Sequence, residues 1–467
     1  MYFKSIYMKL LLNFGIAMLL LFPQINYAEN NISESVAKGQ KLEIAVFDID
    51  ATPPVGTHLA YDIEINKWDL GLRAKGIVLF GAGKPIVLCA VDWIGIANEG
   101  YDAFKKALAE GAGTIPERVD LHTIHQHDAP RCDFSAEKIL IEQGLDPICY
   151  EGTFARETIS RLKAAVAKAV KNKKEITHIG MGQAEVFKVA SNRRIFGNDG
   201  NFIGERYTTC SDSALRNKPE GLIDPMVSVV SFWDVKDPIA VISYYAVHPQ
   251  SYYRTGIANP DFPGVARFMR QLAVPGALHI HFNGAGGDLG AGKYNDGAKE
   301  NRLILAERLA DGMKRAWENT KKEAITSDSV HWEVEPVSFP PASSIKSIGS
   351  WVKGADPVFL ANNLFKTAWK DRVQKGKKID ITCLKIGKVR ILGLPGEAFI
   401  EYQLLAKAER PDLFVAVAAY GDYGTGYIPT DEDYEKGGYE VTDGAGVTRG
   451  AGYILNNAIK KLLNGND

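Results

Sequence analysis

The sequence predicts a mixed α/β (α+β) fold in which mixed β-sheets are layered against helices. Strand-like runs interleave with runs of helical spacing from Leu42 onward, which is typical of such layers. No repeat, low-complexity linker or sharp shift in composition divides this part of the chain. A hydrophobic content of 46% with 24% charged residues is that of a globular protein. We therefore expect residues 42–467 to form one large domain, although length alone would suggest about two to three.

The N-terminal segment has the character of an export signal. Lys4 and Lys9 precede an apolar run that continues to Phe22, as in the basic and apolar regions of a signal peptide. The run is short for a membrane span. We therefore expect residues 1–28 to be a signal peptide, residues 29–41 to be a polar tether, and the protein to be exported to the periplasm or secreted. An uncleaved N-terminal anchor is the alternative.

The elements expected after the tether follow in chain order. Apolar or alternating runs predict strands at residues 42–47, 74–80, 85–91, 119–127, 226–233, 239–246, 379–386, 389–394 and 413–419. The second and third of these flank Gly81 to Lys84 and are expected to form a strand pair. Helical spacing predicts helices at residues 101–108, 154–170 and 300–317. Two lysine-rich pieces, 171–174 and 321–322, are expected to be solvated turns.

Charge and cysteine usage exclude two classes of function. The formal net charge is −1, so the chain lacks the basic surplus that phosphate backbones demand and nucleic acid is not an expected partner. The five cysteines show no CxxC spacing, which argues against a cysteine-based zinc knuckle. Export would permit disulfides. Cys132 and Cys149 are the candidate bridge, and the odd count leaves a thiol unpaired in a monomer.

A histidine pair lies at the end of the run 119–127. Because strand side chains alternate, His125 and His127 are expected on one face and His122 on the other. Two imidazoles at this spacing can chelate one ion, and imidazole suits zinc. An HxH pair is equally typical of two satisfied histidines at a strand edge. His279 and His281 form a second pair with the same spacing, and spacing alone does not rank the two.

Two further residues could complete a zinc site. His248 follows the apolar strand 239–246, and Glu397 follows the strand 389–394 and the breaker Pro395-Gly396. Strand ends on one side of a sheet converge, and sites in α/β folds collect there. A catalytic zinc site needs three or more ligands and an open position. His248 and Glu397 are therefore candidate third and fourth ligands beside the HxH pair.

Six short blocks follow one another along the chain. They read Asp50-Ala-Thr-Pro-Pro-Val-Gly56, His125-Gln-His127-Asp-Ala-Pro130, Asn192-Arg193-Arg194, Ala246-Val-His-Pro-Gln-Ser251, Pro395-Gly-Glu397 and Gly426-Tyr-Ile-Pro-Thr430. In this order they are similar to the motifs D-I-T-P-P-x-G, H-T-H-S-G-P, N-R-S, A-V-H-x-T-S, P-G-E and G-Y-V-T-T of one family. The chain thus resembles the catalytic domain of the neutral ceramidases, and more closely that of their shorter bacterial relatives.

The resemblance implies a zinc ligand set. In the family, the histidines of HxH and A-V-H, the glutamate of P-G-E and a late tyrosine hold zinc. Carried over, this implies His125, His127, His248, Glu397 and Tyr423. Tyr423 lies four residues before Tyr427 where the family has three, so Tyr427 is the alternative. The resemblance gives His279 and His281 no metal role, and a place in the core or behind the ligands is expected for them.

The chain departs from the family at a hexapeptide, G-D-V-S-P-N, whose serine is often treated as important. Here the stretch reads Gly287-Asp-Leu-Gly-Ala-Gly292, with Gly290 in place of the serine. A mechanism that needs this hydroxyl is excluded, and ceramide becomes a less certain substrate. The stretch also approaches a phosphate-binding loop, but Tyr294 stands where that loop needs Ser or Thr. The glycines are better explained by close backbone approach to the metal pocket.

Three residues are candidates for catalytic roles beside the zinc ligands. Arg193 aligns with the N-R block and is expected to stabilise an oxyanion or to hold a carbonyl or acid group, with a surface salt bridge as the alternative. Asp288, with Asn283, is expected to orient a ligand histidine, or to cap a turn. Asp261 follows the His248 loop and matches an acidic position of the family. It is expected to support the ligands, or to be a turn residue.

The combined expectation is an exported zinc hydrolase that cleaves an amide bond of an N-acyl, ceramide-like substrate. Zinc would polarise the carbonyl and activate water, and a nearby acidic group or histidine would pass the proton to the leaving amine. The substrate is expected to be a small molecule or lipid-like, which is compatible with peripheral membrane contact. One alternative is a zinc hydrolase of another bond, such as an ester in a glycan or lipid. The other is a non-catalytic secreted binding protein with this fold.

Overall fold

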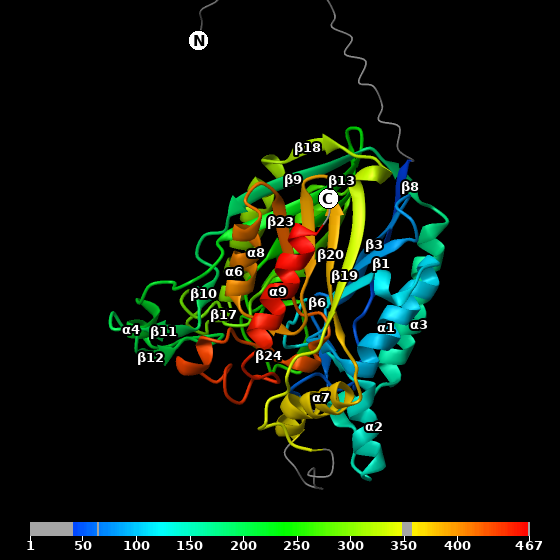
Figure 1. Ribbon diagram of the computed structural model, residues 1–467. Helices are drawn as coiled ribbons and strands as arrows, with labels where there is room; N and C mark the ends of the chain where they lie inside the picture. The colour runs from blue at the N-terminus through cyan, green and yellow to red at the C-terminus, as the bar shows by residue number, and fades with distance from the viewer. Residues whose placement is uncertain (1–40, 63–64, 348–356, 466–467) are drawn as a thin grey trace, which may run out of the picture. The chain divides into compact units, whose positions relative to one another are not determined.

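Three β-sheets form the centre of the protein (Figure 1). The computed structural model describes residues 41–62, 65–347 and 357–465. Contacts join these described residues into one compact unit. The segments expected to be a signal peptide and a tether lie, apart from Lys41, outside the described residues. Among the helices that the structure describes, none is both long and apolar enough to cross a membrane.

Each large sheet mixes antiparallel and parallel pairs, which confirms the predicted fold class. The first sheet has the order β6-β4-β3-β1-β8, the second β16-β14-β13-β9-β18 and the third β19-β20-β21-β23. Their strands are β1 Leu42–Asp50, β3 Arg73–Phe80, β4 Ile86–Val91, β6 Val119–Thr123, β8 Lys174–Ile176, β9 His178–Glu185, β13 Met226–Asp234, β14 Asp237–Tyr245, β16 Leu278–Asn283, β18 Lys321–Ala324, β19 Val330–Val337, β20 Ile379–Ile386, β21 Val389–Gly393 and β23 Phe414–Ala418.

Every large sheet contains one parallel pair, and these pairs bring strand ends together. The pairs are β4–β6, β14–β16 and β21–β23. The last residues of β6 and β16 bond to the loop after β23: Thr123 N–H donates to Tyr420 O at 3.0 Å, and Ala419 N–H donates to Asn283 O at 2.9 Å. The carboxyl ends of β6, β16 and β23 therefore meet at one place in the molecule.

A shared apolar core holds the three sheets against one another. One cluster of buried side chains draws on all of them, for example Leu88 from β4, Phe282 from β16 and Leu384 from β20. Full burial of such a side chain stabilises the fold by about 1.5–3 kcal/mol. The convergence of the strand ends is therefore fixed by the packing of the core.

Helices cover the outer faces of the sheets. In Figure 1, α1 and α3 lie side by side along the strands of the first sheet, and α1 also contacts β6. α5 and α6 pack against the second sheet, and α8 and α9 against the third. The helices are α1 Asn98–Ala112, α2 Phe134–Glu142, α3 Thr153–Val170, α4 Ser213–Arg216, α5 Asp261–Ala273, α6 Asn301–Glu318, α7 Pro357–Gln374, α8 Ile400–Glu409 and α9 Ala451–Asn464.

Most expected elements are present, and the differences have physical reasons. The strand pair 74–80 and 85–91 is the antiparallel pair β3–β4. Of the two lysine-rich pieces expected to be turns, the first does turn at Lys171 and Asn172 and then enters β8 at Lys174. The second piece is instead part of an edge strand, because β18 begins at Lys321. Both strands end a sheet, and lysines at a sheet edge discourage pairing with other chains. All five cysteines are free thiols, so the suggested bridge between Cys132 and Cys149 is wrong.

Candidate metal centre

The HxH pair lies in a loop rather than in a strand. β6 ends at Thr123, four residues short of the expected strand end at His127, and His125 has a φ of +72°. This left-handed conformation is uncommon for a residue with a side chain. The His125 N–H donates to Trp93 O at 3.0 Å, which holds the bend. The bend, and not strand alternation, brings the two imidazoles to the same side.

Three imidazole nitrogens converge on one point. The Nε2 atom of His125 lies 3.1 Å from that of His248 and 3.3 Å from that of His127, and the remaining side of the triangle, between His127 and His248, is 3.3 Å. Ligand nitrogens about 2.0–2.1 Å from a tetrahedral ion lie about 3.3 Å apart. The triangle therefore has the dimensions of three ligands around one ion. No other group of three or more possible ligands converges among the described residues.

Glu397 and Tyr423 adjoin the triangle. Glu397 Oε2 lies 3.4 Å from His125 Nε2 and 3.7 Å from His248 Nε2. Its other oxygen, Oε1, accepts a hydrogen bond from the Tyr423 hydroxyl at 2.5 Å. The Tyr427 hydroxyl instead bonds to that of Tyr439 at 3.0 Å. Of the two candidate tyrosines, Tyr423 is thus the one whose hydroxyl contacts Glu397.

Carbonyl groups behind the histidines fix the ring orientation. Nδ1 of His125 donates to Ile94 O at 2.6 Å, and Nδ1 of His248 donates to Gly286 O at 3.3 Å. A carbonyl only accepts, so the proton of each neutral ring lies on Nδ1 and the Nε2 lone pair faces the triangle. This is the usual support for a metal-bound histidine. His127 lacks such a bond, but Tyr61 stacks on its ring with centroids 5.2 Å apart.

Burial keeps the site in the state that binds a cation. The pKa values of His127 and His248 lie well below the ordinary value, because burial and nearby positive charges oppose a second proton. Burial alone would raise the pKa of Glu397, but the neighbouring His125 and the Tyr423 hydroxyl outweigh it and hold the pKa below its usual range. The neutral imidazoles of His127 and His248 and the ionised carboxylate of Glu397 are donors suited to a divalent metal ion.

A cavity of about 670 Å³ opens onto the three histidines. The cavity is of the size that takes a drug-sized or lipid-like molecule. Its walls carry aromatic rings and several cations. The aromatic and cationic lining residues are Tyr61, Arg131, Arg193, Tyr207, Tyr253, Arg254, Lys346, Phe359, Phe365, Lys366, Tyr423, Tyr427 and Tyr439. A substrate in this cavity would therefore touch the imidazole triangle.

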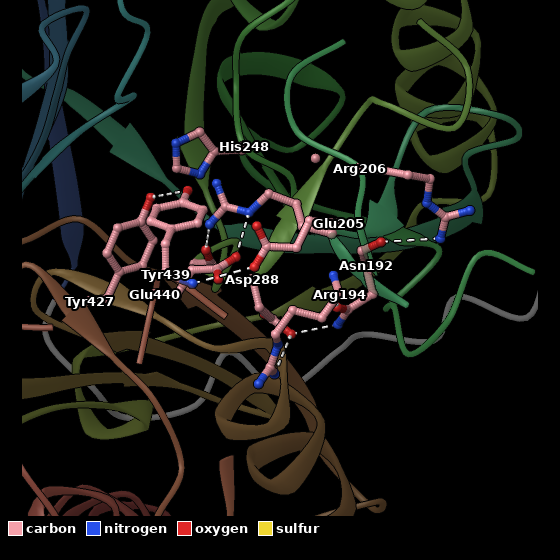
Figure 2. Close-up of polar contacts among 12 residues, drawn as sticks. Asn192, Arg194, Glu205, Arg206, His248, Asp288, Tyr427, Tyr439 and Glu440 are labelled. Carbon is pink, nitrogen blue, oxygen red and sulfur yellow. Dashed lines mark hydrogen bonds and ion pairs between the residues drawn. The ribbon is translucent and has the colours of Figure 1, made fainter. Parts of the chain in front are cut away.

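Arg193 lines this cavity, as its expected role requires. Its guanidinium lies over the rings of Tyr427 and Tyr439, 5.3 and 5.2 Å from the centroids. Nε pairs with Glu440 at 3.0 Å, and Nη2 donates to Gly287 O. Figure 2 shows the two tyrosine rings side by side, near His248. Arg193 is thus held rigidly beside the histidines and is not a surface salt bridge.

Asp288 does not line the cavity. It accepts hydrogen bonds from Asn192 Nδ2 at 2.6 Å and from Ile400 N–H at 2.9 Å, and Arg194 lies 3.8 Å away. Figure 2 shows this buried polar group. It ties the Arg193 segment to the start of α8, three residues after Glu397. Asp288 thus positions two site segments and, in this structure, orients no histidine. Asn283 also orients no histidine, because its side-chain amide has no hydrogen-bond partner.

Asp261 also lies behind the site. It begins α5, and its carboxylate accepts from Ser251 N–H at 3.0 and 3.1 Å and pairs with Arg302 at 3.4 Å. Ser251 is three residues after His248. Asp261 therefore anchors the loop that carries His248 and does not line the cavity.

The rival histidine pair is remote from the triangle. His279 and His281 lie within β16 and are buried. Nδ1 of His281 bonds to Ser243 Oγ at 2.9 Å. Their place in the core is the one that the family resemblance implies.

Gly290 pairs with Ser191 in the short sheet β10–β17 (Ser191–Asn192, Leu289–Gly290). A Cβ atom added there would come within 3.2 Å of Tyr207 O and 3.3 Å of Arg193 Cγ. A side chain at position 290 would thus be in close contact with Arg193, which lines the cavity. Glycine leaves Arg193 room to lie against the tyrosines.

Several cavity residues escaped the sequence analysis. Tyr61, Arg131, Arg254 and Lys366 lie outside the HxH, A-V-H and P-G-E motifs. Lys366 lies on α7, a helix that the sequence pattern did not predict. Only Tyr61 could have been suspected from the sequence, because it follows the matched block Asp50–Gly56 by five residues.

The fold of this chain is similar to that of two solved ceramidase structures. A solved ceramidase complexed with C2 matches with a TM-score of 0.65 and 16% identity, covering 91% of this chain and 75% of the other. The neutral ceramidase from Pseudomonas aeruginosa matches with a TM-score of 0.64 and 17% identity over the same shares. The resemblance is thus confirmed as one of fold. No family model and no curated protein sequence matches the chain.

Proposed function

We propose that the protein is a zinc-dependent hydrolase that cleaves an amide bond of an N-acyl, lipid-like substrate. The observation that carries the proposal is the triangle of three Nε2 atoms, 3.1 to 3.3 Å on a side, at the floor of a substrate-sized cavity. The fold is shared with two ceramidase structures, which supports amide hydrolysis. Imidazole nitrogens with one carboxylate are donors typical of catalytic zinc.

A zinc ion bound to His125, His127, His248 and Glu397 would polarise the scissile carbonyl and make a water acidic near neutral pH. The residues of the chain then have separate tasks. The Tyr423 hydroxyl donates to Glu397 Oε1 and so keeps Oε2 toward the histidines. This hydrogen bond therefore fixes the orientation of the carboxylate that would hold the ion.

Arg193 supplies positive charge at the cavity wall. Its guanidinium is held by Glu440 and by the Gly287 carbonyl, so no reorganisation is needed when negative charge develops on the carbonyl oxygen. Gly290 offers no hydroxyl, so the proposed reaction uses no serine. The lysine-flanked apolar run near the N-terminus supports action outside the cytoplasm.

Metal content tests the central claim. Purified wild-type protein is expected to contain about one zinc per chain, and His125→Ala and His248→Ala are expected to lose it together with amidase activity. His279→Ala is the matched control and is expected to keep both. Stoichiometric zinc in the wild type that depends on His279 and not on His125 would disprove the assignment.

Gly290 favours one second candidate, a zinc esterase, because it stands where the family has a serine that is often treated as important. An amide and an ester with the same acyl chain separate the two. If the zinc-loaded protein hydrolyses only the ester, the proposed amidase activity is wrong and the esterase activity takes its place. A non-catalytic binding protein would not need three imidazoles and a carboxylate around one point. Absence of turnover of both the amide and the ester would favour the binding protein.

A further inference from the structure

One cavity residue carries a buried charge without a counter-charge. Four lysines are buried among the described residues, and Lys366 is 5% exposed. Its Nζ donates to the main-chain oxygen of Asp443 at 2.6 Å and, within the described structure, has no carboxylate in ion-pair range. Buried lysines are almost never unpaired. The other three have partners: Lys75 pairs with Asp48, Lys105 with Asp380 and Lys385 with Glu333.

The ammonium of Lys366 is held at the cavity wall. Its stem packs against two glycines: a Cβ added to Gly426 would lie 3.5 Å from Cδ, and one added to Gly446 would lie 3.4 Å from Cγ. Gly426 directly follows the turn that carries Tyr423. Burial lowers the pKa of Lys366 to about 8, although Glu397 and Asp443 act in the opposite direction. The lysine is thus still largely protonated at neutral pH, in a place that costs free energy unless an anion is bound.

Arg254 provides a second cation without a counter-charge. It lines the cavity and is exposed. Its guanidinium lies 5.5 Å from the centroids of both Tyr61 and Tyr253, and in the described part of the chain it pairs with no carboxylate. Both tyrosine rings contact the ring of His127. The guanidinium therefore lies close to the metal site.

The cavity as a whole has an excess of positive charge. Two carboxylates line it, Glu397 and Asp443, and Glu397 belongs to the metal site. Five cations line it, Arg131, Arg193, Arg254, Lys346 and Lys366, and one of them, Arg193, is paired with Glu440 behind the wall. A bound divalent metal would add to this excess. Such a field attracts anionic ligands and gives nothing to a neutral one.

We propose that the substrate is an N-acyl compound whose amine part carries a carboxylate, as in an N-acyl amino acid, and that Lys366 and Arg254 bind this carboxylate. The inference rests on the proposed function and narrows its substrate class. Hydrolysis breaks the acyl C–N bond, adds the water oxygen to the acyl carbon and leaves the nitrogen with the water's proton. Ammonium and guanidinium groups are the usual partners of a carboxylate. Ceramide offers them no charge.

A matched pair of substrates tests the proposal. N-dodecanoylglycine and N-dodecanoylethanolamine share the acyl chain and the amide, and differ mainly in a carboxylate against a hydroxymethyl group. The zinc-loaded wild type is expected to have at least a tenfold higher kcat/KM for the glycine compound. Lys366→Met and Arg254→Gln are expected to lower the ratio of the two kcat/KM values about tenfold each, and Lys366→Arg to restore most of it.

The control variant is Lys370→Met. Lys370 lies one turn further along α7, and its Nζ also donates to a main-chain oxygen, that of Ile345, but it does not line the cavity. It is expected to leave the ratio unchanged. Lys366→Met removes an unpaired buried charge, so its thermal unfolding temperature is expected not to fall. If Lys366→Met fails to fold, the Arg254→Gln variant, changed at an exposed position, tests the proposal in its place.

Zinc also attracts carboxylates. Binding measured without metal therefore isolates the contribution of Lys366 and Arg254 to carboxylate binding. Metal-free wild type is expected to bind N-dodecanoylglycine at least tenfold more tightly than N-dodecanoylethanolamine, and Lys366→Met to abolish the difference. Equal affinity and equal kcat/KM for the two compounds in the wild type would overturn the inference and leave the hydrolase standing. Lysine-dependent binding with turnover of neither compound would overturn the hydrolase and retain the anion site.

Discussion

At the scale of single residues, the two candidate tyrosines have different partners. Tyr423 bonds to Glu397, whereas Tyr427 bonds to Tyr439 and stacks on His248. The position of one hydroxyl thus decides which tyrosine acts on the metal side of the cavity and which on the substrate side. Motif spacing favoured Tyr423 only when a one-residue insertion was allowed, and it left Tyr427 as the alternative.

We expect Tyr423→Phe to weaken zinc binding, or kcat at saturating zinc, by about 10- to 100-fold, since loss of a residue that orients a ligand costs about that much. Tyr427→Phe is the matched control and is expected to change KM more than zinc affinity. Zinc titration and kcat measurement distinguish them. Equal zinc affinity in the two variants, with kcat retained in Tyr423→Phe, would remove Tyr423 from the site.

Asp288 stabilises the site from behind, by joining the segment of Arg193 to the start of α8. Asp288→Asn keeps the shape of the side chain but places an amide N–H against the donors of Asn192 and Ile400. We expect the free energy of unfolding to fall by about 1–3 kcal/mol, measured in urea, with zinc content per folded chain unchanged. Asp311→Asn, at an exposed position on α6, is the control. A loss of kcat above 100-fold with unchanged stability would make Asp288 catalytic.

At the scale of elements, strand ends rather than strand faces build the site. The sequence indicated which residues follow strands, and His248 and Glu397 lie where those breaks predicted. It could not show the bend at His125, because a positive φ depends on the Trp93 carbonyl that holds it. The sequence also could not predict which cations line the cavity, since α7 brings Lys366 to the site only through tertiary packing.

The buried pair on β16 gives the fold a dependence on pH. Burial, with nearby positive charges, lowers the pKa of His279 to about 4 and that of His281 to about 3. Each unfolded imidazole binds its proton near pH 6.5, so the unfolded state takes up more protons between pH 6.5 and 4. Stability is therefore full above pH 6.5 and falls as the pH drops, by about 3 kcal/mol for His279.

Urea unfolding at a series of pH values checks this expectation. In metal-free protein, which removes the loss of zinc as a cause, His279→Gln combined with His281→Asn is expected to flatten the decline between pH 6.5 and 4. His331→Asn, at an exposed position of β19, serves as the control. An identical decline in the double variant and the wild type would show that other groups cause it.

At the scale of the whole molecule, the site joins the three sheets. β6 of the first sheet leads to His125, β14 of the second to His248, and β21 of the third to Glu397. A ligand held by all three loops stabilises the folded state by mass action, by about 4 kcal/mol when its free concentration is 1,000 times Kd. We expect a chelator to lower the unfolding temperature by several degrees, and zinc to restore it. The same treatment is expected to leave His125→Ala unchanged, and an unaffected wild type would contradict the three-sheet site.

The sequence separation of the ligands has a kinetic consequence. His125 and His248 stand 123 positions apart, and Thr123, beside the pair, bonds to Tyr420 across 297 positions. Contacts of such long range form late in folding, because the loops between them must close first. The candidate metal site is therefore complete only when all three sheets have formed. If it binds an ion as proposed, uptake of the ion reports on completed folding, and a chain truncated before the last strands is expected not to hold it.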